Sequence, residues 1–578
     1  MQSVDFTTLI ASCNELCNKW LPARLEQFYQ IDRHTILVAL RTWQERSWLT
    51  LSWHPQAARI CLGDPPPREP DTFTFSEQLR HQLNGYALID IVTLASWERV
   101  LDLRFAKRPD DPPDYHLYLE VMGKHSNLIL TDNNNQVITV AHQVGRTQSS
   151  VRTVQTGQSY SPPPPVLKKD PKQTFDLWKE TIKLIPGSLQ VQILANYQGL
   201  SPVVAKTLIA KAHLESDCAT DTLTEIDWHN LYNCWLDWLN SIDKGEFQPG
   251  STETGYTVLG WQVKQSYAST QELLNRYYSN ILKQEQFDKL HHQLKQKVSY
   301  LLNKLTIKKE GFCNRLKQSE SSQSYQERAN LLMANLHQWK PGLDSIILAD
   351  FTSGELVEIS LQPDKNMVAN AQILYKQHQK LKRVSASVQP LLEATQVEIH
   401  YLANVLSSLE QLEKYQGVDD FDILEEIQQE LIAQKYLELT RQTARKEQSK
   451  PYRLLSPSGF ELIIGRNNRQ NDQITFTTSS NYDLWFHTQQ IPSGHVLLRV
   501  PPGSQPEQSD LQFAADWTAY YSQARSSQLV SVIYTLPKYL YKPKGSKPGM
   551  VIYKNETVIW GCPDRVSPKK ADKSGGII

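Results

Sequence analysis

Two long segments with helical periodicity, both between residues 265 and 450, set the strongest limit on the fold. Apolar residues recur there in steps of three and four. In the first segment they are Leu290, Leu294, Val298, Leu301 and Leu305. In the second they are Leu381, Val384, Val388 and Leu391 and, after one register skip near Thr395, Ile399, Leu402, Leu406 and Leu409. Such spacing predicts a long antiparallel coiled coil. An ordinary helical bundle is the alternative, and the abundance of Lys, Gln and Glu on both segments favours the coiled coil.

A small insert at about 340–364 separates the two segments. Residues 346–349 and 355–359 are rich in Ile, Leu and Val and flank a Thr-Ser-Gly turn at 352–354. This pattern predicts a β-hairpin. The long segments would then carry a small middle domain at their far end.

The remaining chain divides into three further domains, because 578 residues exceed what one hydrophobic core accommodates. Residues 1–161 have mixed α and β character, with strands expected at 35–40, 48–53, 116–122 and 127–132 and a helix at 71–83. Four prolines at 162–165 form an extended linker. Residues 451–562 form an α+β domain, and residues 563–578 are expected to be a disordered tail.

A helical region at 170–262 lies between the first domain and the coiled coil. Residues 189–197 and 203–214 predict two short helices joined by a tight turn, with Ser201 as the cap and Pro202 in the first turn of the second helix. Helix-hairpin-helix units of this kind present backbone amides to phosphates, although any pair of short helices gives a similar pattern.

A polar turn at 465–472 is the strongest candidate for a binding site. Its side chains are mostly amides and guanidinium groups, which bind hydrogen-bonding edges and phosphates and build cores poorly. We expect RNA contacts from Arg466, Asn467, Asn468, Gln470, Asn471 and Asp472.

The strand that follows this turn places Asp483, Trp485 and His487 on one face and Leu484 and Phe486 on the other. The first face predicts a binding surface, with His495 nearby. The alternative is a solvated loop beside a Trp485 that is half-buried in a second core.

A basic segment at 538–549 adds Lys542, Lys544 and Lys547, interleaved with Tyr and Pro. Cations beside aromatic rings suit a phosphate backbone and stacked bases, so we expect these three lysines to contact RNA.

Composition limits the function. The 61 basic and 61 acidic residues balance, so nucleic-acid contact must come from local patches. Seven scattered Cys predict reduced thiols in the cytoplasm, and neither a signal peptide nor a membrane span is expected. Phosphate-loop, zinc-protease and serine-hydrolase motifs are not found in the sequence. We therefore expect a binding protein without catalytic residues, metal or cofactor.

Four stretches resemble the NFACT family of ribosome quality-control proteins. They are residues 120–130 with the turn Gly123, Lys124, His125, Ser126 and Asn127; residues 334–336 with 370–376; residues 465–472 with 483–492; and residues 542–551. The resemblance covers nearly the whole chain. The chain stops after the RNA-binding domain, as bacterial members do.

The resemblance implies a fold and a role. The N-terminal domain would resemble formamidopyrimidine glycosylases, followed by the helix-hairpin-helix region. Family members bind a large ribosomal subunit that holds a stalled nascent chain on peptidyl-tRNA. They contact ribosomal RNA and tRNA, and some direct untemplated alanine addition, which implies alanine tRNA as a partner. The peptide-bond chemistry is the ribosome's, so the protein is not expected to be an enzyme.

The resemblance also implies tRNA-directing residues. Members that add tails carry an early Asp, which Asp5 matches, and a later Asp-Arg pair, which Glu98 and Arg99 match with Glu in place of Asp. Because the Glu98 side chain is longer than that of Asp, an alternative is that this chain is a family member that binds ribosomes but has lost tailing. Two other readings are an extracellular-matrix (fibronectin-binding) adhesin and a DNA glycosylase. The glycosylase nucleophile is an N-terminal Pro amine, whereas this chain begins Met1-Gln2.

Overall fold

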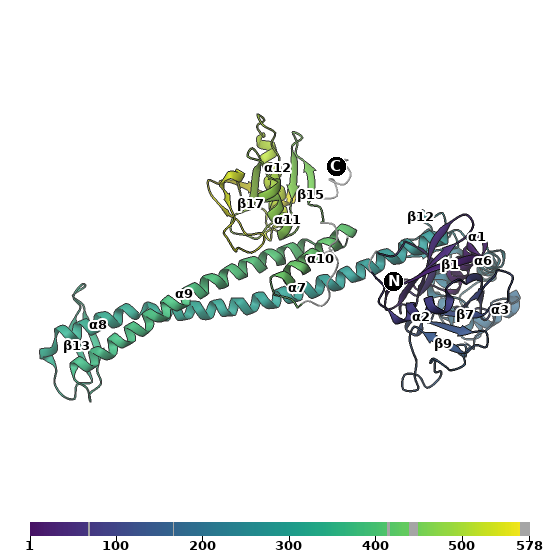
Figure 1. Ribbon diagram of the computed structural model, residues 1–578, viewed down its shortest axis with the longest axis horizontal. Coiled ribbons are helices and arrows are strands. Elements are labelled where there is room, and N and C mark those ends of the chain that lie inside the picture. The colour runs from purple at the N-terminus through teal and green to yellow at the C-terminus, as the bar shows by residue number, and fades with distance from the viewer. Residues whose placement is uncertain (68–69, 166, 413–414, 416, 439–448, 567–578) are drawn as a thin grey trace. The chain divides into compact units, whose positions relative to one another are not determined.

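The computed structural model describes residues 1–67, 70–165, 167–412, 415, 417–438 and 449–566. The chain forms two compact units, Met1–Leu282 and Lys283–Ile578, and the division falls inside one long helix. Both units mix helices with antiparallel sheets (Figure 1). Within the described ranges, no helix combines the length and apolar character that a membrane span requires.

A nine-stranded antiparallel sheet forms the centre of the first unit, in the order β4-β3-β2-β1-β5-β6-β7-β8-β9. The strands are β1 Ala23–Asp32, β2 Thr35–Arg41, β3 Arg46–Ser52, β4 Arg59–Gly63, β5 Ala87–Thr93, β6 Val100–Ala106, β7 Tyr115–Glu120, β8 Asn127–Asp132 and β9 Val137–Val140. The core includes residues of α1 Phe6–Trp20 and α2 Thr74–Leu83. The four predicted strands and the predicted helix of this region are confirmed.

A separate helical core follows in the same unit. Its helices are α3 Phe175–Lys183, α4 Leu189–Asn196, α5 Pro202–Lys211 and α6 Glu225–Lys244. The core includes four buried indoles, Trp178, Trp228, Trp235 and Trp238. The predicted cap is confirmed, because the hydroxyl of Ser201 accepts the Val204 amide at 3.1 Å and Pro202 is the first residue of α5. A small sheet of β10 Gly250–Ser251, β11 Tyr256–Thr257 and β12 Gln265–Ser266 completes the unit.

Two long helices, α7 Thr270–Glu320 and α9 Met367–Gln411, are confirmed where the periodicity predicts them. They run antiparallel, because His291 contacts the Leu409 carbonyl at 2.7 Å and His378 contacts the Ser322 carbonyl at 2.8 Å. Figure 1 shows them side by side. Knobs-into-holes packing stays a prediction, and the end of the predicted coiled coil, 439–448, lies outside the described residues.

The predicted register of α9 is wrong at one point. Leu391 is 51% exposed, whereas Leu392 is buried at 8%. From Val388 the buried or half-buried positions run through Leu392, Thr395 and Ile399 in steps of four, three and four. The heptad pattern is therefore continuous without a register skip, because Leu392 and not the adjacent Leu391 faces the partner helix.

A hairpin closes the far end of the two helices, as predicted. It consists of β13 Ser345–Ala349 and β14 Leu356–Ser360, preceded by α8 Ser322–Ala334 and the short η2 Leu336–Gln338. After α9 comes α10 Val418–Ala433, a helix that the sequence analysis did not identify.

The C-terminal domain is built on a six-stranded sheet in the order β15-β16-β18-β17-β19-β22. Its strands are β15 Tyr452–Leu455, β16 Glu461–Ile464, β17 Leu484–Thr488, β18 Val496–Leu498, β19 Val530–Thr535 and β22 Thr557–Gly561. Helix α12 Gln508–Tyr520 packs on one face.

Short elements cover the other face of this sheet. They are α11 Asn468–Gln473, the π-helical η3 Ile474–Thr478, and the pair β20 Leu540–Tyr541 and β21 Ile552–Tyr553. The start of the predicted disordered tail instead forms η5 Pro563–Arg565, because Pro563 is buried; residues 567–578 lie outside the described residues.

Candidate nucleic-acid interface

A cavity of about 280 Å³ in the first unit brings together the three residues that the family resemblance marks as tRNA-directing. Asp5, Glu98 and Arg99 all line it. Its walls come from the start of α1, from the segment between β5 and β6, and from the turn between α4 and α5. Chain segments almost two hundred residues apart in sequence therefore form one site.

Asp5 has a structural role in this cavity. It is 4% exposed and caps α1, since its Oδ1 accepts the Thr8 amide at 2.8 Å. Its Oδ2 accepts the Ser201 hydroxyl at 2.6 Å, and Ser201 in turn caps α5. One carboxylate thus joins the first turns of two helices, which leaves little of it for a ligand.

Arg99 is the group best suited to bind a ligand. It is half-buried, and its Nη1 donates to the Val4 carbonyl at 3.2 Å. A guanidinium has five N–H donors in a planar fork that matches a phosphate or a base edge. The N-termini of α1 and α5 add partial positive charge to the same cavity, and Lys168 also lines it. The arrangement favours an anionic or hydrogen-bond-accepting ligand despite Glu98.

Trp97 holds the cavity in shape, and the sequence analysis missed it. Its backbone has a positive φ of 63°, and its ring packs on Phe6 and Trp238 at centroid distances of 5.1 and 5.6 Å. A Cβ on Gly199 would lie 2.5 Å from this indole, so the turn between α4 and α5 requires glycine there. The signal in the sequence was a Trp directly before the Glu-Arg pair.

The family turn at 123–127 divides into structural and exposed residues. Ser126 accepts the Met122 amide at 2.9 Å, and Asn127 bonds the His142 backbone in both directions, at 2.8 and 3.0 Å. Lys124 and His125 are exposed, and Gly123 begins a short 3₁₀ turn, η1 Gly123–His125, with a φ of 61°. None of residues 123–127 lines the cavity, although Met122, the residue before this turn, does.

The predicted binding face of β17 in the second unit is buried. Strand alternation is confirmed, because Phe486 and Trp485 belong to different cores. However, Trp485 is 0% exposed, and its Nε1 donates to Thr475 at 3.0 Å. The expectation of an open stacking face is corrected: the short elements of residues 468–478 and 540–553 cover it. The alternative of a second core describes this strand better.

Of the polar neighbours of Trp485, Asp483 and His495 are enclosed and His487 is half-buried. Asp483 is 1% exposed and accepts the Ser480 and Val500 amides at 2.7 and 2.9 Å. His487 stacks on Trp485 at 5.6 Å, and His495 contacts Thr475 at 2.7 Å. Burial lowers the pKa of His487 to about 4 and that of His495 to about 3, so both imidazoles are neutral at physiological pH.

The polar turn at 465–472 docks on α10 instead of facing solvent. Arg466 donates to Asp420, Asn467 to Glu426 at 2.6 Å and Asn468 to Glu430 at 2.9 Å. These three donors are between 1% and 7% exposed. Burial raises the pKa of Glu430 above its ordinary value. The turn is therefore enclosed in this structure, and RNA contact by its residues stays a prediction.

Three further residues of the turn also have partners inside the second unit. Gln470 donates to the Ser449 carbonyl at 3.1 Å, Asn471 accepts the His495 amide at 3.0 Å, and Asp472 accepts the Gly549 amide at 3.1 Å. The sequence does carry a signal for α10 as the docking partner of this turn, because residues 418–433 contain six acidic side chains and no basic one. A row of amides and Arg meets a row of carboxylates.

Two of the three predicted RNA-binding lysines have partners inside the second unit. Lys542 pairs with Asp472. Lys547 donates to the Tyr436 hydroxyl at 2.7 Å and lies over the rings of Tyr401 and Tyr436 at 4.9 and 4.5 Å. Desolvation lowers the pKa of Lys547. Lys544 is exposed. In the described part of the chain, no group of three or more His, Cys, Asp or Glu could hold a metal ion.

Comparison with known proteins gives matches across both units. Residues 5–450 match the family described as NFACT N-terminal and middle domains, and residues 450–555 match the NFACT protein RNA binding domain. A Bacillus subtilis protein named "Rqc2 homolog RqcH" is 29% identical over 584 residues, covering 97% of this chain and 98% of that one. A Streptococcus suis protein of the same name is 29% identical over 564 residues, covering 94% of each.

Solved structures match parts of the chain. The C-terminal part of the fibronectin/fibrinogen-binding protein from Streptococcus suis has a TM-score of 0.38 and 28% identity, covering 50% of this chain and 98% of that one. The N-terminal part of the same protein has a TM-score of 0.40 and 24% identity, covering 48% and 100%.

Proposed function

The chain belongs to the NFACT family, and from that premise we propose that it is an RNA-binding factor of ribosome quality control. Support comes from the match to the family's RNA-binding domain at 450–555 and from curated relatives named RqcH that align over nearly the full length. The proposed partner is the large ribosomal subunit with a stalled nascent chain on peptidyl-tRNA. The proposed location is the cytoplasm, where ribosomes work.

The proposed role of the first unit is to bind tRNA, and the cavity around Arg99 carries this proposal. A half-buried guanidinium between two helix N-termini suits a phosphate or an accepting base edge. Asp5 positions both helices through Thr8 and Ser201 and need not touch the tRNA.

The proposed chemistry is positioning without catalysis. The buried Asp5 carboxylate caps α1 by accepting the Thr8 amide and also accepts the hydroxyl of Ser201, the cap of α5, so both of its contacts are structural. Peptide-bond formation during alanine addition would belong to the ribosome. Our proposal for this chain is that it holds the tRNA while that reaction proceeds.

Alanine tailing depends on Glu98, which lines the cavity with one more methylene than the family's Asp. We propose that tailing is retained in a weakened form, because the carboxylate is present but lies further from the backbone. Tail length on a stalled reporter chain should increase in Glu98→Asp. An equal tail length in both proteins would contradict this, and complete lack of tails in both would favour a member that has lost tailing.

The test of the proposed function is ultraviolet crosslinking in cells, followed by sequencing of the bound RNA. The unchanged chain should enrich large-subunit ribosomal RNA and a small set of tRNAs, alanine tRNA among them. Arg99→Ala should lower tRNA recovery by roughly 10-fold or more, since it removes charge-assisted hydrogen bonds, and should leave ribosomal RNA recovery unchanged. Arg108→Ala, at an exposed arginine of the same domain, is the matched control. No RNA above background would overturn the proposal.

A further inference from the structure

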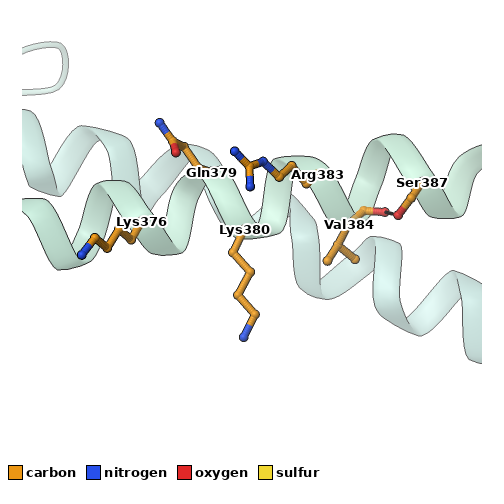
Figure 2. A pocket seen from close by; sticks show the side chains of 6 residues that line it. All are labelled: Lys376, Gln379, Lys380, Arg383, Val384 and Ser387. Carbon is orange, nitrogen blue, oxygen red and sulfur yellow. Dashed lines mark hydrogen bonds between the residues drawn. The ribbon is translucent and has the colours of Figure 1, made fainter.

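An open cavity of about 510 Å³ lies along α9, far in sequence from the predicted RNA-binding residues. Figure 2 shows its side chains arranged along one stretch of helix. The residues that line it are Lys376, Gln379, Lys380, Arg383, Val384 and Ser387. Five of the six are exposed, and Val384 is half-buried.

The three cations form a stripe on one face of the helix. Lys376, Lys380 and Arg383 are separated by four and three residues, which places them one above the other. At 1.5 Å per residue, their Cα atoms are about 6 and 4.5 Å apart along the helix axis. We call these three residues the arm stripe. It is a row of charges held at fixed spacing by a rigid element.

The charge of the arm stripe is not balanced locally. Residues 367–392 of α9 contain four basic residues and no acidic one. Residues 289–317 of α7 contain eight basic residues and one acidic residue. The contact of His378 with Ser322 sets the antiparallel register and brings Arg315 and Lys317 to the level of Arg383. In a chain with no net charge, this concentration marks a polyanion surface.

Other cations of the second unit differ from the stripe. Arg466 and Lys542 are ion-paired with Asp420 and Asp472, and Lys547 is enclosed by two tyrosines. Within the described ranges, no member of the arm stripe has an ion pair. The arm therefore presents cations without ion pairs, whereas these cations of the C-terminal domain have partners inside the second unit.

We propose that the arm stripe binds the phosphate backbone of double-stranded RNA. The proposal rests on the proposed function and adds a contact site on the long helices that the predicted RNA-binding residues do not include. Gln379 and Ser387 supply neutral donors and acceptors, which suit ribose hydroxyls beside the phosphates. Val384 is the only apolar side chain in the cavity, so it lacks the aromatic and aliphatic anchors on which protein interfaces depend.

The test measures binding of the full chain to an RNA duplex of about 16 base pairs over a range of salt concentrations. The stripe variant carries Lys376→Gln, Lys380→Gln and Arg383→Gln. The control variant carries Lys283→Gln, Lys340→Gln and Lys450→Gln, which remove the same charge at exposed lysines that lie outside both basic runs and do not line the cavity. Co-sedimentation with large ribosomal subunits is measured for all three proteins.

The stripe variant should bind the duplex at least ~10-fold more weakly at low salt, and its salt slope should fall by about 0.9 for each lost phosphate contact. The control variant should keep most of the affinity. Equal loss in both variants would overturn the stripe, because net charge alone would then explain binding. Poly-glutamate serves as the probe for an acidic protein. If the stripe variant kept its duplex binding and lost only poly-glutamate binding, the RNA proposal would be overturned in favour of an acidic protein partner.

The same measurements separate the two proposals. If the unchanged chain binds subunits and crosslinks to RNA, and the stripe variant binds the duplex and the subunits equally well, only the arm stripe is overturned. Failure of the unchanged chain to bind duplex, subunit or cellular RNA would overturn the proposed function and the arm stripe together.

Discussion

The cavity around Arg99 and the polar turn at 465–472 are built from similar side chains but are used differently. At the cavity, Arg99 is half-buried, lines an open space and donates one N–H to the Val4 carbonyl, while Asp5 makes the bonds that join two helices. At the turn, Arg466 itself makes the internal bond, to Asp420 on α10. The comparison teaches that an Arg among polar residues stays available to a ligand when no carboxylate of the same chain pairs with it, as Asp420 pairs with Arg466. Four predictions probe this comparison: the core around Trp485, the docking of the turn on α10, the histidines beside Trp485, and the cavity around Arg99.

The largest effect is expected from Trp485→Ala, because the indole is fully buried in the second core of the C-terminal domain. Its loss should lower the free energy of unfolding by roughly 3–5 kcal/mol, measured by denaturant titration. Trp560→Ala, at a site that is 58% exposed, should change it by less than about 0.5 kcal/mol. A folded Trp485→Ala protein with unchanged stability and weaker RNA binding would break the comparison, since the indole would then contact RNA.

The next effect concerns the docking of the turn on α10. Glu426 accepts Asn467 at 2.6 Å and both the amide and the hydroxyl of Ser449 at 2.7 and 2.6 Å. Glu426→Ala should therefore cost roughly 1.5–3 kcal/mol in unfolding measurements. Asp419→Ala, at an exposed site of the same helix, is the control.

RNA affinity of the Glu426→Ala protein gives a second readout. Our expectation is no gain in affinity, because the turn is a permanent internal contact. A clear gain would show that α10 covers an RNA-binding turn. The turn at 465–472 and the cavity around Arg99 would then both be ligand sites.

Acid should weaken the C-terminal domain through its buried histidines. Because the folded pKa of His487 is about 4 and an unfolded imidazole titrates near 6.5, the unfolded chain binds more protons between these values. Stability should therefore fall as pH drops below about 6.5, by about 2 kcal/mol at pH 5 for this group. His487→Leu should flatten this part of the pH profile of unfolding, and an equally steep profile in both proteins would rule out His487 as the source.

The smallest effect is expected at the cavity. Asp5→Ala removes the cap of α1 and the acceptor of Ser201, which should cost about 1 kcal/mol. Arg99→Ala should leave the free energy of unfolding nearly unchanged while lowering tRNA binding. If Arg99→Ala destabilises the first unit more than Asp5→Ala does, the division between a structural carboxylate and a binding guanidinium is wrong.

Local patterns predicted the elements of this fold well. β2, β8 and the β13–β14 hairpin follow alternation and turn residues, and α5 begins at the predicted cap. The candidate site was only partly predictable. The cavity residues Asp5, Glu98 and Arg99 came from the family resemblance, whereas the pairing of Asp5 with Ser201, 196 residues away, had no local signal.

The sequence by itself determined which residues share a strand or helix face, because the backbone repeats every two or 3.6 residues. It placed Trp485 and Phe486 on opposite faces and built two long helices with an apolar seam. Only the tertiary structure decided what covers each face. Burial of Trp485 depends on segments that fold back from 468–478 and 540–553, and burial of Asn467 depends on the acidic face of α10. Periodicity is a property of the local chain, whereas exposure depends on packing between segments distant in sequence.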